Sequence, residues 1–144
     1  MKTEENKLSF TIKNELVEIP RTAEVILQHA RNANWPSVWI SNANLVLDEL
    51  ITNTISYGNL DSSEAAIRIE LTVENNQLVI VMEDKGVEFN PFEEAIEPDL
   101  EADIGDRLIG GLGVYFVKIL ASDYSYERTG NTNRIRLVLE AAEE

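Results

Sequence analysis

Alternation of apolar and polar residues predicts five β-strands in this chain. Leu8, Phe10 and Ile12, for example, alternate with polar neighbours, which is the two-residue period of a strand with one buried face. Residues 78–82 are instead apolar at every position, as expected of a central strand that is covered on at least one side. The predicted strands are residues 8–12, 67–73, 78–82, 124–128 and 134–139.

A helical period predicts three helices between these strands. The first opens at Ile19-Pro20, and its apolar residues recur at the i, i+3, i+4, i+7 spacing of one buried face. The second runs from about residue 38 to residue 57 and stops at a glycine, which is a common helix end. The third covers about residues 112–121 and directly follows a group of glycines.

The order of these elements predicts a two-layer α/β sandwich, a mixed sheet with helices on one face. The length of the chain, 144 residues, suits a single domain that covers residues 1–144. Between the third predicted strand and the third helix, residues from about 90 to 107 show no convincing period and carry two prolines. A loop of this length in a compact domain usually has a function, so we predict a lid at about 90–109.

Composition excludes several classes of function. Twelve Lys and Arg residues against 26 Asp and Glu residues leave a net charge of −14, which repels polyanions, and the bases are scattered, so direct nucleic-acid binding is not expected. No apolar run approaches the roughly 20 residues of a membrane-spanning helix, and no signal-peptide pattern opens the chain, so no membrane association is expected. The absence of cysteine excludes disulfides and thiolate metal sites and suits a cytoplasmic protein.

Glu49 and Asn53 are the first candidate site residues, four positions apart in the second predicted helix. They lie one turn apart, on a different face from the apolar residues around Leu50. Asn53 offers a hard carbonyl oxygen that suits Mg²⁺, and Glu49 can accept a proton or orient a water. The alternative is the exposed polar face of an amphipathic helix, because such pairs are common.

Asp84 and Gly86 form the second candidate feature, at the end of the most apolar strand. An acidic side chain in this place can accept a hydrogen bond from an exocyclic amine such as that of adenine. Gly86 lets the backbone turn tightly and approach a flat ring. The alternative is an ordinary turn from strand to loop, where Asp-x-Gly is frequent.

A glycine cluster before the third predicted helix is the third feature: Gly110, Gly111, Leu112 and Gly113. Glycines at a helix N-terminus let backbone amides converge on an anion, and the helix dipole adds to the attraction. The cluster is not a Walker A loop, because no Gly-Lys-Ser/Thr follows it. A flexible hinge is the alternative, although a hinge does not need three glycines within four residues.

Taken in order, these features resemble the ATP-binding domain of the histidine-kinase-like ATPase superfamily, which has the Bergerat-type ATP-binding fold. The resemblance covers about residues 8–139. Within it, residues 47–58, 110–118 and 126–133 look most like the anti-sigma-factor branch of serine/threonine protein kinases. Glu88 stands where the wider superfamily has a second glycine in its Asp-x-Gly-x-Gly motif.

The resemblance implies a role for each of these residues. Glu49 would be the catalytic general base, Asn53 the Mg²⁺ ligand, and Asp84 the contact to the adenine amine. Gly86 would lie against the adenine ring. The phosphates of ATP would lie along the cluster of Gly110, Gly111, Leu112 and Gly113.

The resemblance also implies partners. In this branch the domain phosphorylates a serine on an anti-anti-sigma protein, can sequester a sigma factor, and commonly forms a homodimer. An alternative is a nucleotide-dependent binding module that sequesters a partner without phosphoryl transfer. It is motivated by the segment from Glu93 to Asp106, which contains seven acidic residues and no basic one. A third alternative is a domain that no longer binds ATP.

Overall fold

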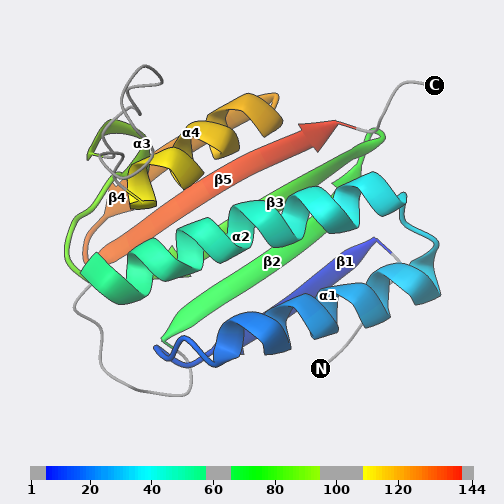
Figure 1. Cartoon of the computed structure of the whole chain (residues 1–144), viewed down its shortest axis with the longest axis horizontal. Coiled ribbons are helices and arrows are strands. Elements are labelled where there is room, and N and C mark those ends of the chain that lie inside the picture. The colour runs from blue at the N-terminus through cyan, green and yellow to red at the C-terminus, as the bar shows by residue number, and fades with distance from the viewer. Residues whose placement is uncertain (1–5, 58–65, 95–108, 141–144) are drawn as a thin grey trace.

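The computed structural model (Figure 1) describes residues 6–57, 66–94 and 109–140. Every predicted strand and helix is present in it, with bounds that differ by a few residues at most. No helix in this part of the chain combines the length and the apolar character needed to cross a membrane. The elements are β1 Lys7–Ile12, α1 Glu18–Ala33, α2 Ser37–Tyr57, β2 Ile67–Glu74, β3 Gln77–Asp84, α3 Pro91–Glu94, α4 Ile109–Leu120, β4 Asp123–Thr129 and β5 Thr132–Glu140.

The five strands form one sheet in the order β1-β2-β3-β5-β4, and every neighbouring pair is antiparallel. The prediction of a mixed sheet is therefore wrong. A single helix between two strands returns the chain in parallel, but here two antiparallel helices, α1 and α2, connect β1 to β2 (Figure 1). The pair of helices brings the chain back to the end where β1 stopped, so β2 runs in the opposite direction.

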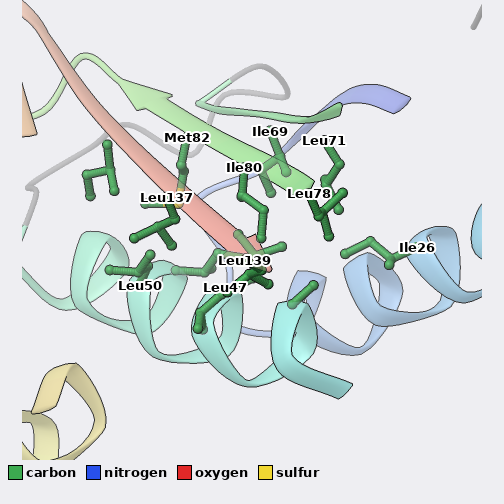
Figure 2. Packing of buried hydrophobic residues seen from close by; sticks show 14 of the residues in the cluster. Ile26, Leu47, Leu50, Ile69, Leu71, Leu78, Ile80, Met82, Leu137 and Leu139 are labelled. Atoms are coloured by element: carbon green, nitrogen blue, oxygen red, sulfur yellow. The ribbon is translucent and has the colours of Figure 1, made fainter. Parts of the chain in front are cut away.

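The helices α1, α2 and α4 cover one face of the sheet, which confirms the two-layer arrangement (Figure 1). The core lies between the layers: Leu47 and Leu50 of α2 pack toward Ile80 and Leu137 of the central strands, each at most 1% exposed (Figure 2). The opposite face of the sheet carries ion pairs, such as Arg68 with Glu83 at 2.9 Å. β2 thus alternates between an apolar face and a charged one, as the sequence pattern predicted, whereas Val79 and Val81 of β3 form a second apolar cluster with Val138.

Residues with left-handed backbone end several elements. Asn34 ends α1 with a φ of 56°. Asn75 and Asn76, with φ of 52° and 60°, form the two-residue turn between β2 and β3, where both central positions need positive φ. Gly130 has a φ of 61° at the tip of the β4–β5 hairpin. Asparagine and glycine tolerate the left-handed region better than other residues, which is why they lie at these ends.

The segment predicted as a lid differs from the prediction at both of its ends. Its first residues are not loop but the short helix α3, where the Asn90 side chain accepts a hydrogen bond from the Phe92 amide at 3.0 Å. At its other end α4 begins at Ile109, so the glycine cluster lies within the first turns of the helix instead of preceding it. The intervening residues 95–108 lie outside the described part of the chain.

One end of the sandwich gathers the predicted site residues. The C-terminal ends of α2 and β3 and the N-terminal ends of α4 and β5 all lie there, on the left in Figure 1. Asp84, the last residue of β3, is paired with Asn133 near the start of β5. The topology thus brings together three motifs that are far apart in the sequence.

Candidate functional site

A small pocket opens at this end, between α2, the ends of β3 and β5, and the segment that follows β3. The pocket has a free volume of about 10 Å³, which is room for roughly one water. A planar base needs more space, so its entry requires the pocket walls to separate. The wall around Phe89 belongs to no helix or strand, and Phe89 stacks on Tyr57 with ring centres 5.4 Å apart. The pocket is lined by Leu50, Asn53, Thr54, Asp84, Val87, Phe89, Pro91, Asn133 and Ile135.

Asp84 is buried in this pocket at the end of β3, with an exposed fraction of 6%. Its Oδ1 atom accepts hydrogen bonds from the Gly86 amide at 2.8 Å and from Asn133 Nδ2 at 3.0 Å. The first of these bonds closes the tight turn that the Asp-x-Gly pattern predicted. Within the described residues no hydrogen bond is formed to Asp84 Oδ2. Asp84 therefore shapes the turn and also leaves an acceptor for a ligand.

Asn133 is a polar residue of the site that the sequence pattern did not single out. It is 4% exposed, and its Nδ2 also donates to the Val87 carbonyl at 2.8 Å. Its Oδ1 accepts from the Tyr126 hydroxyl and from Arg128 Nη1, the latter at 3.1 Å. Only the pairing of β3 with β5 places Asn133 opposite Asp84, and no local signal announces that pairing.

Tyr126 and Arg128 of β4 support the same end of the pocket. Arg128 Nη1 donates to the Gly86 carbonyl at 2.7 Å, so the guanidinium bridges the turn after β3 and the Asn133 side chain. Burial raises the pKa of the Tyr126 phenol above its ordinary value, which keeps the hydroxyl protonated. Both side chains are thus donors toward Asn133.

Asn53 is buried in the pocket, with an exposed fraction of 6%, which rules out an exposed polar helix face for this residue. Glu49 lies one turn earlier on α2, and its Oε2 atom is buried without a hydrogen-bond partner among the described residues. Burial raises the pKa of Glu49 to about 7, and the neighbouring charge of Asp48 adds to this, whereas a hydrogen bond with Asn53 opposes it. A carboxyl with such a pKa changes its protonation state near neutral pH, as a general base must.

These residues fit a magnesium–nucleotide ligand chemically. A buried carboxylate oxygen without a partner is costly unless something binds it, and it lies beside a buried amide on the same helix. Hard oxygen atoms of this kind are the ligands that Mg²⁺ prefers. The open oxygen of Asp84 adds an acceptor that suits an amine on a base.

The glycine cluster lies at the start of α4, at the same end of the sandwich (Figure 1). The first four amides of an α-helix have no acceptor within the helix, and here those four belong to residues 109–112. Gly110, Gly111 and Leu112 therefore carry amides of the kind that bind phosphate, and Gly113 follows directly. The earlier start of the helix moves the cluster into its first turns and keeps this chemistry.

Comparison with known proteins identifies the class to which this fold and site belong. The chain belongs to the histidine kinase-like ATPase domain family, whose model matches residues 12–139. It is similar to the serine/threonine-protein kinase BtrW of Bordetella bronchiseptica, with 25% identity over 119 residues that span 82% of this chain and 83% of that protein. Because this is a family of ATPase domains, membership in it implies that the domain binds ATP.

Solved structures agree on the fold. The chain is similar to the RsbU and RsbW domains of Rv1364c from Mycobacterium tuberculosis, with a TM-score of 0.67 and 10% identity, over 93% of this chain and 32% of that one. It is also similar to the Acinetobacter baumannii histidine kinase AdeS, with a TM-score of 0.51 and 12% identity, over 92% of this chain and 67% of that one. The chain thus spans about a third of the first structure, and both likenesses concern the fold alone.

The raised pKa of Glu49 predicts a pH-dependent stability. Between about pH 4.5 and pH 7 the folded state holds a proton that the unfolded state has released, so the free energy of unfolding falls as the pH rises through this window. Because the carboxyl is partly exposed, we expect a loss of about 1–2 kcal/mol, less than the full shift implies. Urea titrations of the wild type and Glu49→Gln at several pH values measure it, and parallel pH profiles for the two proteins would contradict it.

Proposed function

We propose that the chain binds Mg-ATP in this pocket and acts as an anti-sigma-type serine/threonine protein kinase. Its substrate is a serine on an anti-anti-sigma protein in a partner-switching system, and a sigma factor is the protein that it sequesters. One observation carries the proposal: Glu49 has a buried carboxylate oxygen without a partner in the described chain, one turn from the pocket in which Asn53 and Asp84 are buried.

The residues would divide the work as follows. Asp84 would accept a hydrogen bond from the adenine amine, and Gly86 would lie against the ring. The amides around Gly110, Gly111, Leu112 and Gly113 would hold the phosphates, and the side-chain oxygen of Asn53 would bind Mg²⁺. The segment at about 90–109 would cover the nucleotide, and the whole of 1–144 would act as one domain.

Glu49 would act on the incoming hydroxyl. ATP supplies the phosphoryl group and, with Mg²⁺, the charge balance for its transfer. As the serine oxygen forms its bond to phosphorus, its proton must leave, and the ionised Glu49 carboxylate would take that proton. A pKa of about 7 leaves Glu49 ionised in a good fraction of molecules at neutral pH and still basic enough to accept it.

The partners are proposed from the named relatives. BtrW is called a serine/threonine-protein kinase, and the structural likeness to the RsbU and RsbW domains extends over nearly the whole chain. The name of BtrW favours a kinase that acts on serine or threonine over a sensor kinase that phosphorylates its own histidine, whereas the structural likeness concerns the fold alone. A cytoplasmic location and homodimer formation belong to the same proposal.

The test is direct transfer of label. Purified protein is incubated with γ-labelled ATP, Mg²⁺ and the cognate anti-anti-sigma protein, and the phosphorylated residue is located by mass spectrometry. Label on a serine of the partner is the expected result. If calorimetry shows that ATP binds but no label appears on the partner, the proposed kinase activity is contradicted and the proposed nucleotide site is not.

A second function is favoured by the acidic segment from Glu93 to Asp106. Its seven acidic residues and lack of any base supply no positive charge for the transferred phosphoryl group. In this alternative the chain binds ATP in order to sequester a partner, without transfer. Partner capture that requires ATP and survives Glu49→Ala would favour this module, whereas loss of capture in that variant would count against it.

A further inference from the structure

The orientation of the Asn133 amide is determined by its neighbours. Arg128 can only donate hydrogen bonds, so the atom that faces it at 3.1 Å must be the amide oxygen. The Val87 carbonyl can only accept, so the atom that faces it at 2.8 Å must be the amide nitrogen. The two ends of the side chain therefore cannot be exchanged, and the nitrogen points to Asp84.

Asn133 has no hydrogen-bonding capacity left for a ligand. Its two N–H groups are used by Asp84 Oδ1 and the Val87 carbonyl, with a longer contact of 3.5 Å to the Gly86 carbonyl. Its oxygen already accepts from Tyr126 and Arg128, which fills both lone pairs. Although Asn133 lines the pocket, it can act on a base only through Asp84.

Asp84 is left with a single open atom. Its Oδ1 accepts from the Gly86 amide and from Asn133, so rotation of the carboxylate would break two hydrogen bonds in a buried place. Breaking such bonds without replacement is unfavourable. The carboxylate therefore presents Oδ2, an acceptor in a defined position, to whatever enters the pocket.

We propose that Asn133, supported by Tyr126 and Arg128, is a positioning residue that determines base specificity. It holds Asp84 so that the pocket selects a purine with an exocyclic amine over one with a keto oxygen at the same carbon. This inference rests on the proposed function, because it takes Asp84 as the residue that meets the base. A keto oxygen at that place would set an acceptor against an acceptor in a buried site, which removes a hydrogen bond and adds repulsion.

Inosine triphosphate tests this selectivity, because its base carries a keto oxygen where adenine carries the amine. The dissociation constants of ATP and of inosine triphosphate are measured with Mg²⁺ by calorimetry, and their ratio is the readout. We expect the wild type to prefer ATP by roughly 100-fold. Asn133→Leu, of similar size, should reduce this ratio about tenfold, since the carboxylate loses one of its two restraints.

Asn131→Leu is the matched control, because Asn131 is exposed at the tip of the same hairpin and forms no hydrogen bond with Asp84 or Asn133 in the described structure. It should keep the wild-type ratio. An Asn133→Leu protein that folds, and that weakens both nucleotides equally or keeps the ratio, would overturn the inference. Failure of the wild type to bind ATP would instead overturn the proposed function.

Tyr126→Phe keeps the proposal testable if Asn133→Leu does not fold. It removes only the hydroxyl that donates to Asn133 Oδ1 and leaves the ring in place. The ratio should then fall a fewfold, roughly two- to fivefold, because Arg128 still holds the amide. If Asn133→Leu is unfolded and Tyr126→Phe shows the wild-type ratio, the positioning role is refuted.

Discussion

Replacement of Glu49 by glutamine is expected to slow phosphoryl transfer by about 10²- to 10⁴-fold, the usual contribution of a general base. Glutamine has the same shape and can still form a hydrogen bond with Asn53, but it cannot take the proton of a serine. The affinity for Mg-ATP should change little, because the amide does not disturb the base or phosphate contacts. Single-turnover transfer of labelled phosphate to the partner, beside calorimetry of ATP, separates the two effects.

The pH dependence of the wild type gives an independent check on the same residue. Transfer needs the ionised form of Glu49, whose pKa is about 7, so the rate should rise between about pH 6 and pH 8. Glu24→Gln, an exposed change of the same kind on α1, is the control and should behave as the wild type. Transfer by Glu49→Gln at the wild-type rate would remove Glu49 from the mechanism.

Replacement of Asn53 by alanine is expected to weaken Mg-ATP binding by about 10- to 100-fold, the size of effect seen when groups that support a metal site are removed. The buried amide oxygen is the hard ligand that the site offers to the ion. The loss should therefore depend on the metal. Calorimetry with ATP and Mg²⁺, repeated with the chelator EDTA in place of Mg²⁺, gives the two affinities.

Asn42→Ala is the matched control for this change, since Asn42 lies on the same helix about three turns before Asn53. A thermal scan of both variants reveals any general loss of stability. An equal loss of ATP affinity with and without Mg²⁺ would show that Asn53 contacts the base or supports the fold and does not bind the ion. Unchanged affinity in both conditions would show that ATP binds elsewhere. If the wild type does not bind ATP at all, the remaining interpretation is a domain that no longer binds the nucleotide.

The site has one architectural requirement that the sequence motifs do not express. Asp84 and Asn53 are buried polar residues at the edge of an apolar core, and each must keep its hydrogen bonds or bind a ligand. The hairpin of β4 and β5 meets this need for Asp84 through Asn133, Tyr126 and Arg128. Residues 126–133 of this hairpin carry part of the family resemblance but were given no role in the site from the sequence, and they support the residue proposed to read the base.

The sequence alone determined the elements and their faces. Leu47 and Leu50 are buried because their spacing follows one side of a helix. Asn75, Asn76 and Gly130 lie at turns because asparagine tolerates the left-handed backbone and glycine has no side chain to oppose it. These are local properties, set within a few residues, so periodicity and turn chemistry were enough. The order of the three motifs was also sufficient for the resemblance that the family comparison confirms.

The tertiary structure decided what depends on residues far apart in the chain. The antiparallel sheet follows from the paired helices α1 and α2, the raised pKa of Glu49 follows from burial, and the contact between Asp84 and Asn133 spans 49 residues. Strand pairing and desolvation depend on many residues that are far apart in the sequence, so no local sequence pattern predicts them. For that reason the sequence could name Asp84, while only the folded chain reveals which side chains hold it.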